Sequence, residues 1–492
     1  MRYLSTRDEN ITASPSEAII MGLASDGGLF IPGNIEEIKV DYKELIDKSY
    51  KEIAIEVFSK FFPDLIMDIP EIVEQSYDNK FSDNKITPLK CYGDKIFLEL
   101  FHGPTCAFKD VALSALPNLM NAAAKKIGFK KKILILTATS GDTGSAAMKG
   151  FSDVKDTGII VFYPDEGISE IQRLQMTTQE AENVVACAIR DNFDAAQKGV
   201  KKILEERDIN RDDVSLSSAN SINIGRLVPQ VVYYFAAYKE LVSKGKIEIG
   251  DKVSFTVPTG NFGDIMAGWF AKSMGLPIER LICASNKNDV LADFLSDGHY
   301  DKRREFYKTE SPSMDILVSS NLERLLYYVA GAKKTARYMK DLETKGWYRI
   351  EESELEEIKE IFIGCSSDDE EAKASIRECF NKNGCLIDTH TATAYAGYEK
   401  LIKDKPYENI TNVILATASP FKFPKAVLSA IANKVDGDDR DCVDRLSHLT
   451  GFSVPSKLHE VFTKPVKSED VINKDEMRDY VDEKINKKVL GI

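Results

Sequence analysis

The chain has 492 residues, of which 43% are hydrophobic and 29% charged, so it is long enough for two or three packed globular domains. Its formal net charge of -13 disfavours nucleic acid and anionic membranes as partners. The eight cysteines are scattered without a CxxC pair, which argues against a disulfide framework or a zinc site and favours reduced thiols in the cytoplasm.

The first 90 residues predict a separate, mainly helical unit. It has a turn-rich opening, GLASDGGLFIP at 22–32, and a helical pattern over 42–62. The start of the chain has no basic segment followed by an apolar run, so we expect no secretory signal. The apolar runs elsewhere are too short to cross a bilayer and indicate buried strands.

From about residue 90, short apolar runs alternate with helical patterns of the length expected for βαβ units. The runs are continuous rather than alternating, which is typical of strands covered on both faces of a parallel sheet. We expect a long helix over 225–245 and a solvated helix face over 467–488. The fold class is therefore α/β, with two doubly wound parallel sheets. The predicted strands are 95–101, 131–138, 158–164, 183–190, 252–258, 280–286 and 412–418.

Four strand-to-helix turns carry unusual residues, and ligands of α/β sheets gather at such ends of strands. In the first turn, Lys109 stands just before an apolar helix that begins near Asp110. The positive end of that helix and partial burial both disfavour a protonated amine, which leaves the nucleophile that Schiff-base chemistry needs. Taken alone, the motif also fits a lysine that extends from a helix start into water.

The second turn has Gly260 and Gly263 between a strand and a helix. Their missing side chains let backbone N–H groups approach a phosphate, and the helix dipole favours the same ligand. The spacing matches neither the dinucleotide-binding motif nor the P-loop. A glycine-rich connection without a ligand is the alternative.

The third turn gathers the hydroxyls of Thr139, Ser140 and Thr143 where a helix starts. One such residue suffices for a helix cap, so the surplus favours a site that binds a carboxylate. The fourth turn has Arg226 among Asn and Ser donors, which suits the several acceptor oxygens of a phosphate. As alternatives, the third turn is a simple cap and Arg226 pairs with a surface carboxylate.

The five histidines show no spacing that indicates a metal site, and we assign no metal. His102 and His390 lie near the turns, yet a lone histidine is more often structural. We therefore expect neither of them to be catalytic.

Together these motifs resemble the threonine synthase family, which belongs to the fold type II pyridoxal-phosphate enzymes. The resemblance runs through almost the whole chain, and the motifs stand in the order of the family's longer branch. They are GLASDGGLFIP, FHGPTCAFKD, ATSGDTG, YPDEGISEIQRLQM, SANSINIGRLVPQ, PTGNFGD, SPSMDILVSSNLERL, CLIDTHTATA and LATASPFKF. Cys106, Ser419 and Phe421 depart from the residues usual in the family, which we interpret as packing variations.

The resemblance implies a role for each matching residue. Lys109 would be the catalytic lysine that holds pyridoxal 5'-phosphate. The cofactor phosphate would lie in the loop of Gly260, Asn261, Phe262, Gly263 and Asp264. Thr417 would face the pyridine nitrogen, and Asp142 would lie near the phenolic oxygen, where an acidic group repels a phenolate unless something shares a proton. Thr139, Ser140 and Thr143 would bind the substrate carboxylate, and Asn220, Ser221, Asn223 and Arg226 the substrate phosphate.

The implied domains are an N-terminal domain (1–90), a large cofactor-binding domain (91–112 and 245–492) and a smaller substrate domain (113–244). The implied reaction is conversion of O-phospho-L-homoserine and water to L-threonine and phosphate, the last step of threonine biosynthesis, by a monomer or homodimer. A phospho-lyase that gives 2-oxobutyrate from the same substrate, and a catalytically silent sensor of a phosphate ligand, are the alternatives. A dehydratase fits less well, because its substrates lack the phosphate that the fourth turn predicts.

Overall fold

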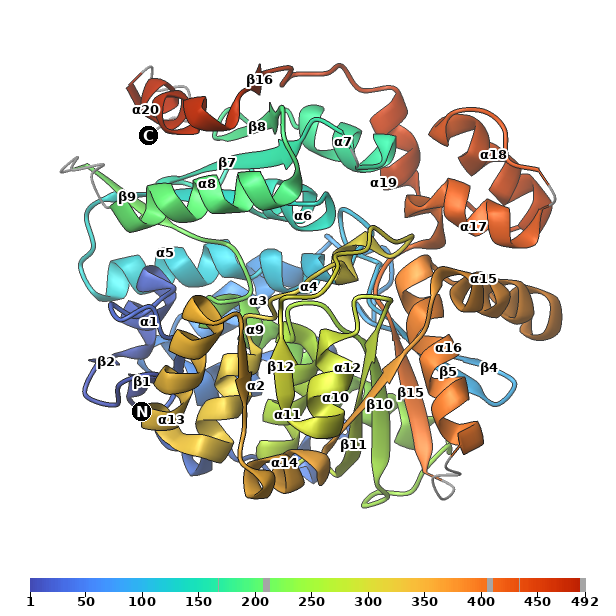
Figure 1. Ribbon diagram of the computed structural model, residues 1–492, viewed down its shortest axis with the longest axis horizontal. Helices are drawn as coiled ribbons and strands as arrows, with labels where there is room; N and C mark the ends of the chain where they lie inside the picture. Colours follow the sequence, from blue (N-terminus) through green and yellow to red (C-terminus); the bar gives the residue numbers. More distant parts are fainter. Residues whose placement is uncertain (167, 207–212, 405–409, 433, 487–492) are drawn as a thin grey trace.

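Two separate sheets organise the chain, one above the other in Figure 1, with the N-terminal unit beside the lower one. This computed structural model describes residues 1–492 except 167, 207–212, 405–409, 433 and 487–492. All seven predicted strands are present, and the α/β architecture with parallel sheets is confirmed.

The larger sheet has six strands. Adjacent strands in this sheet are parallel, except for β4 and β5 at one edge, which form an antiparallel hairpin. In order across the sheet, the strands are β14 (Phe362–Ser366), β11 (Ile278–Ser285), β10 (Val253–Pro258), β15 (Thr411–Ala416), β5 (Lys95–Glu99) and β4 (Leu89–Tyr92). Since β15 lies between β10 and β5, the turns that follow these three strands meet at one edge.

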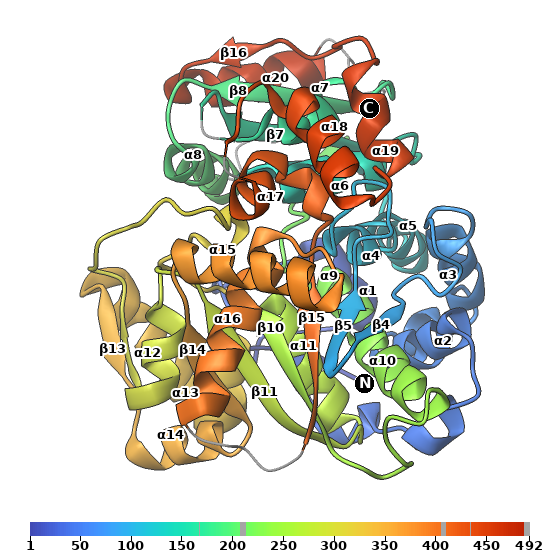
Figure 2. The same ribbon diagram turned by 90° about the vertical axis from the view of Figure 1, so that its right-hand side faces the viewer.

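The smaller sheet has five strands, all parallel to their neighbours. They are, in order, β16 (Val471–Ile472), β8 (Val184–Ile189), β7 (Thr157–Pro164), β6 (Lys132–Ala138) and β9 (Val214–Ser217). Figure 2 shows this sheet from the side, with the chain's last helix lying along it.

The tail predicted as a solvated helix face is instead part of this smaller unit. Its strand β16 pairs with β8, and α20 (Met477–Asn486) buries Met477, Val481 and Ile485 in the same core as β7 and β8. The spacing of these apolar residues gives one buried helix face, which the many charges around them obscure. The last two residues of the predicted tail lie outside the described residues.

The N-terminal unit contains a small antiparallel sheet that the helical pattern did not predict. Its elements are β1 (Tyr3–Ser5), β2 (Thr12–Ala13), β3 (Phe30–Pro32), α1 (Pro15–Met21), η1 (Ile35–Ile38), η2 (Tyr42–Leu45), α2 (Tyr50–Phe61), η3 (Pro63–Leu65) and α3 (Ile69–Tyr77). The predicted helix 42–62 is divided because Ser49 and Glu52 form a capping box that starts α2 anew.

The predicted helix 225–245 is likewise divided, into α9 (Ile224–Leu227), η4 (Val228–Gln230) and α10 (Val231–Ser243). Pro229 lacks the N–H that a continuous helix needs at this point. The longest helix among the described residues, α13 (Leu322–Thr344), is kinked at Gly331, whose φ is 76°.

The remaining elements connect and cover the two sheets. They are α4 (Lys109–Leu113), α5 (Leu116–Lys126), α6 (Asp142–Phe151), α7 (Glu170–Thr177), α8 (Phe193–Glu206), α11 (Gly263–Ser273), α12 (Val290–Asp297), β12 (His299–Asp301), η5 (Pro312–Met314), β13 (Trp347–Arg349), α14 (Glu352–Lys359), α15 (Asp369–Glu378), η6 (Cys379–Asn383), α16 (Thr389–Asp404), η7 (Pro420–Lys422), α17 (Pro424–Ile431), α18 (Asp439–Thr450), α19 (Ser456–His459), η8 (Glu460–Phe462) and η9 (Lys474–Glu476).

None of the helices in the described part of the chain has the length and hydropathy that a bilayer-spanning helix requires. The eight cysteines are free thiols, and six of them are buried.

Candidate active site

Lys109 is the first residue of α4, and its amine is buried between the two sheets. The side chain is 8% exposed, and Nζ lies 3.6 Å from Asp142 Oδ2 and 3.3 Å from Ser313 Oγ. Burial lowers the pKa of Lys109 to about 8, with Asp142 opposing the shift and Arg226 adding to it. The uncharged amine that a nucleophile or base requires is therefore more populated near neutral pH than in an ordinary lysine.

The loop before Lys109 is fixed by its own hydrogen bonds. Asp110 accepts bonds from the backbone N–H of Thr105 at 2.8 Å and from its hydroxyl at 2.7 Å. Phe108 N–H donates to the carbonyl of Thr417 at 2.8 Å. Since Thr417 follows β15 and Lys109 follows the neighbouring β5, the sheet order brings these two predicted site residues together.

Asp142 starts α6 and is almost completely buried. A second lysine, Lys422, is 0% exposed and places Nζ 3.0 Å from Asp142 Oδ1, and Gln172 donates to the same oxygen at 2.9 Å. Burial alone would raise the pKa of Asp142, but Lys422 and then Lys109 outweigh it, so the pKa lies below its usual range. The carboxylate is thus held charged by Lys422, which the sequence motifs did not single out.

The predicted cofactor-phosphate loop lies at the start of α11. Phe262 has a φ of 59°, a left-handed conformation that turns the chain into the helix at Gly263. A side-chain carbon at Gly260 would lie 2.6 Å from the carbonyl oxygen of Ser313, so glycine is required there. Asp264 is buried, accepts a hydrogen bond from Tyr233 at 2.5 Å, and has its pKa raised to about 6 by burial.

The predicted carboxylate turn lies where α6 begins. The hydroxyl oxygen of Thr139 accepts bonds from Gly141 N–H and Gly144 N–H, both at 2.9 Å, and so shapes the turn itself. Ser140 and Thr143 are half-buried at the same helix start. The turn therefore combines a helix amino terminus with side-chain hydroxyls, which suits a carboxylate ligand.

The predicted substrate-phosphate loop contacts the cofactor loop directly. A side-chain carbon at Gly263 would lie 3.2 Å from Ser221 Cβ. Arg226 is 6% exposed and donates to the carbonyl of Ala219 at 2.6 Å, and burial lowers its pKa to about 10. Asn220 is half-buried beside them. Two loops suited to anions thus lie side by side.

Asn223 is placed differently from its neighbours in this loop. It is 0% exposed, its Nδ2 donates to the carbonyl of Ile19 at 2.9 Å, and its Oδ1 accepts from Gly225 N–H at 2.9 Å. Its side chain therefore caps α9 and joins the loop to the N-terminal unit. Its predicted contact with a substrate stays a prediction.

The segment 311–324 connects these loops, although no role was assigned to its residues from the sequence. Ser319 Oγ donates to the carbonyl of Gly260, and Asn321 Nδ2 donates both to Asn261 O and to Ser221 Oγ, each at 2.9 Å. The two hydrogen bonds of Asn321 join one anion loop to the other, so Asn321 fixes the distance between the loops. In the sequence, Asn321 was marked only by its place in the motif SPSMDILVSSNLERL.

Arg324 supports the same region through hydrogen bonds to backbone carbonyls and to Asn321. It is 0% exposed, and its guanidinium donates to the carbonyls of Ile222 at 2.6 Å and Phe30 at 3.2 Å, and to Asn321 Oδ1. A fully buried guanidinium bonded mainly to carbonyls holds backbone in place rather than serving a surface ion pair.

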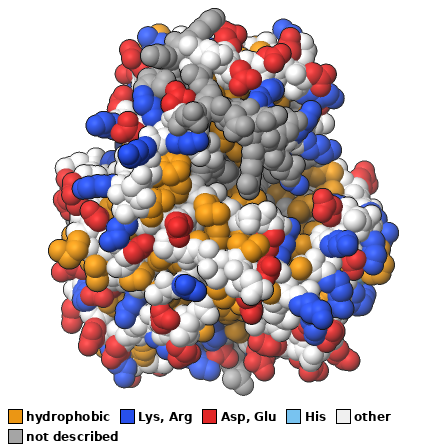
Figure 3. Space-filling model, turned by 90° about the vertical axis from the view of Figure 1, so that its left-hand side faces the viewer, with side chains coloured by type: hydrophobic (Ala, Val, Ile, Leu, Met, Phe, Trp, Pro, Cys, Tyr) orange, Lys and Arg blue, Asp and Glu red, His pale blue; other side chains and the backbone are white. Residues whose placement is uncertain are grey.

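Three buried cations gather at the site although the chain is acidic. Lys109, Arg226 and Lys422 are all buried, and both of the other cations lower the pKa of Lys109. On the face shown in Figure 3, by contrast, acidic and basic side chains are interspersed. Asp142 neutralises Lys422, whereas Arg226 bonds to the carbonyl of Ala219 and can still attract anionic groups such as phosphates and carboxylates. Among the described residues, no group of His, Cys, Asp or Glu side chains is arranged to hold a metal ion.

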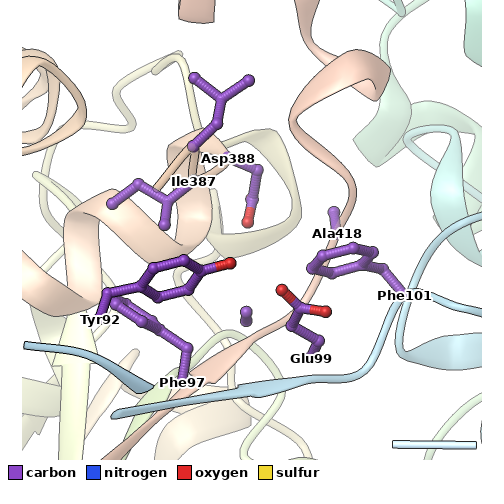
Figure 4. A pocket seen from close by; sticks show the side chains of 9 residues that line it. Tyr92, Phe97, Glu99, Phe101, Ile387, Asp388 and Ala418 are labelled. Carbon is purple, nitrogen blue, oxygen red and sulfur yellow. The ribbon is translucent and has the colours of Figure 1, made fainter. Parts of the chain in front are cut away.

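A small hollow lies beside the site, at the ends of β5 and β15 (Figure 4). Glu99, Asp388 and the ring of Tyr92 line it, and its volume is about 10 Å³. That volume holds about one water molecule and excludes a substrate. Asp388 faces this hollow and also bonds to His390, whose Nδ1 lies 3.0 Å from Asp388 Oδ1.

These residues fit pyridoxal phosphate. The buried amine of Lys109 can attach the aldehyde, the start of α11 offers backbone N–H groups to the phosphate, and Thr417 lies next to the Lys109 loop. Asp142 with Lys422 supplies a neutralised carboxylate at the edge of the same space.

Comparisons with known proteins show the family to which the chain belongs. Three family models match: "Threonine synthase N terminus" over 2–77, "Pyridoxal-phosphate dependent enzyme" over 84–417 and "Threonine synthase, C-terminal" over 391–481. The chain is 38% identical over 467 residues to threonine synthase of Saccharomyces cerevisiae, covering 87% of this chain and 89% of that protein. It is 38% identical over 480 residues to threonine synthase-like 1 of Homo sapiens, covering 92% of this chain but only 63% of that longer relative.

The crystal structure of pyridoxal-phosphate-bound threonine synthase from Brucella melitensis superposes with a TM-score of 0.86 at 36% identity, covering 99% of each chain. The matched family model and this cofactor-bound neighbour identify pyridoxal phosphate as the cofactor. The chain belongs to the threonine synthase family of pyridoxal-phosphate-dependent enzymes.

Proposed function

We propose that this chain converts O-phospho-L-homoserine and water to L-threonine and phosphate. The observation that carries the proposal is Arg226, a buried guanidinium whose side chain, among the described residues, hydrogen-bonds only to the carbonyl of Ala219. A buried charge without a charged partner is costly, and a phosphate on the substrate would offset that cost. The similarity to threonine synthases supports the same substrate.

In this reaction, the Cγ–O bond to phosphate breaks and the oxygen of water bonds to Cβ. Pyridoxal phosphate supplies the electron sink that makes the substrate Cα–H acidic. Lys109 takes the proton from Cα with its uncharged amine and moves protons along the substrate, since its pKa of about 8 suits both directions of transfer.

The other residues bind and orient the substrate. We infer that the turn of Thr139, Ser140 and Thr143 binds the carboxylate. Arg226 and Ser221 bind the phosphate and stabilise it as it leaves, an electrostatic effect of roughly 3 kcal/mol in pre-organised sites. The released phosphate, still held at Arg226, takes the proton of the attacking water.

The test is to incubate the purified protein with O-phospho-L-homoserine and to measure threonine and phosphate together. Equal amounts of both products are expected, and Lys109→Ala is expected to form neither. Borohydride reduction followed by peptide mapping should place the cofactor on Lys109. Reduction that labels another lysine, or none, would refute the assignment.

The same assay distinguishes the alternatives. Release of phosphate with 2-oxobutyrate and ammonia in place of threonine would make the protein a phospho-lyase. Binding of the substrate without any product would make it a phosphate-ligand sensor. A lysine whose pKa is lowered to about 8 beside two loops suited to anions favours an enzyme over a sensor.

Three further expectations stay proposals. We propose that the protein acts in the cytoplasm, as a monomer or homodimer without nucleic-acid or membrane partners. We also keep the predicted domains, 1–90, 91–112 with 245–492, and 113–244. Limited proteolysis would test these boundaries, and light scattering would test the number of subunits.

A further inference from the structure

Ser313, in the short helix η5, contacts the amine that performs the proposed chemistry. Its hydroxyl oxygen accepts a hydrogen bond from Lys109 Nζ at 3.3 Å. The same hydroxyl donates to Asp142 Oδ2 at 3.1 Å. Because Asp142 is held charged and can only accept, the hydroxyl proton points at Asp142 and a lone pair is left for Lys109.

The backbone around Ser313 is fixed from two sides. Its N–H donates to His390 Nε2 at 3.1 Å, and its carbonyl lies against Gly260, where a side-chain carbon would come within 2.6 Å. Since Nε2 accepts, the proton of an uncharged His390 sits on Nδ1 and is donated to Asp388 at 3.0 Å. Both residues of this pair are buried, so their orientation is fixed by the fold.

We propose that Ser313 is a catalytic residue of this site and that His390, held by Asp388, is the residue that positions it. The inference rests on the proposed function, in which Lys109 removes the Cα proton. The serine hydroxyl accepts a hydrogen bond from the amine both before and after it gains that proton. It thereby aims the lone pair of Lys109 and stabilises the ammonium that forms.

Steady-state kinetics of the loaded enzyme give the first test. Ser313→Ala should lower kcat by about tenfold or more while KM changes by less than about twofold, because the bond is made to the reacting amine and not to the substrate. Ser313→Thr keeps a hydroxyl and should restore part of the rate. Ser273→Ala, near the far end of α11 with its hydroxyl bonded to the carbonyl of Trp269, is the matched control.

A substrate deuterated at Cα separates a catalytic from a structural role. In Ser313→Ala the isotope effect on kcat should rise above that of the unmodified enzyme, because proton removal becomes slower than the other steps. Loss of rate with an unchanged isotope effect and a raised KM would mean that Ser313 only supports the loop, and would overturn the proposal.

A third measurement does not depend on turnover. In the cofactor-free protein, acetic anhydride labels the uncharged amine of Lys109, and mass spectrometry follows the labelling against pH. Ser313→Ala should move the midpoint to lower pH, because the lost acceptor had favoured the ammonium form. Ser313→Cys, of similar size and with a weaker acceptor, should move it in the same direction and serves if the alanine variant folds poorly. An unchanged midpoint in both variants would overturn the contact.

His390 is tested in the same way. His390→Gln keeps an acceptor for the N–H of Ser313, whereas His390→Leu removes that acceptor. The pH midpoint of Lys109 labelling should therefore stay closer to that of the unmodified protein in His390→Gln than in His390→Leu. Equal effects of the two substitutions would refute the positioning role. A protein that forms no threonine but shows these labelling shifts would contradict the proposed function while leaving the contact between Ser313 and Lys109 in place.

Discussion

Replacement of Lys422 by methionine tests whether the buried ion pair with Asp142 is as important as its geometry indicates. Lys422 is 0% exposed, lies 3.0 Å from Asp142 Oδ1 and donates to the carbonyl of Thr105 at 2.9 Å. Methionine keeps the length of the side chain and removes the charge and the donors. Asp142 then remains buried with Gln172, Ser313 and the more distant Lys109 as partners.

Removing one partner of a buried ion pair costs about 3–5 kcal/mol, and the remaining partners of Asp142 place this case near 3 kcal/mol. Unfolding entropy of about 2.1 cal/mol/K per residue gives roughly 1 kcal/mol/K for 492 residues that unfold together. The expected fall in Tm is therefore about 3 °C, and larger where one domain unfolds by itself.

Scanning calorimetry of the cofactor-free proteins measures this shift. The double variant Lys422→Met/Asp142→Asn removes both charges and should recover most of the lost stability, since the buried carboxylate is gone and Lys109, with a pKa of about 8, can release its proton. Lys382→Met is the matched control, because Lys382 is 72% exposed and pairs at 3.1 Å with Glu378, which is 44% exposed. A fall no larger than that of the control, or a double variant as unstable as the single one, would refute the reasoning.

Four further outcomes follow from the site. Arg226→Ala should lower the rate of phosphate release by about a hundredfold while cofactor absorbance is retained, and an unchanged rate would exclude Arg226 from the site. Gly260→Ala should weaken cofactor binding by about tenfold in a fluorescence titration, because its new carbon would lie 2.6 Å from the carbonyl of Ser313. The rate at which the cofactor attaches to Lys109 should increase as pH rises through about 8 and then level off, since only the uncharged amine reacts. A rate that is independent of pH, followed by stopped-flow absorbance, would contradict the lowered pKa of Lys109. Asn321→Ala should weaken binding of both the cofactor and inorganic phosphate in calorimetric titrations, because it contacts both anion loops.

The fold was predictable where the signal is local. Runs such as 131–138 and 158–164 are long, apolar and rich in β-branched residues, so burial on both faces of a sheet is their consistent interpretation. The sequence did not predict β9 and β14, because their sequences VSLS and FIGCS contain polar residues or glycine. These segments form strands because they pair with neighbouring strands. The N-terminal strands are only two or three residues long, below what periodicity detects.

The site was predictable only in part for the same reason. Lys109, Gly260 and Arg226 stand in turns whose composition is unusual by itself. Ser313 and Lys422 are single polar residues in short 3₁₀ helices, and their partners lie far away in the sequence: Lys109 is 204 positions from Ser313. No local pattern encodes such a contact, which exists only once both sheets have formed.

The N-terminal unit helps to hold residues of the predicted site in place. Asn223 Nδ2 donates to the carbonyl of Ile19, and Ser217 Oγ to that of Ile20 at 3.2 Å, so the end of α1 supports the predicted substrate-phosphate loop. Arg324 binds the carbonyls of Phe30 and of the same loop. The cofactor loop at α11, by contrast, is built on the larger sheet. The two predicted anion loops therefore rest on different parts of the chain. Asn321 bonds to both of them and Arg324 bonds to Asn321, so these two residues hold the loops at a fixed distance.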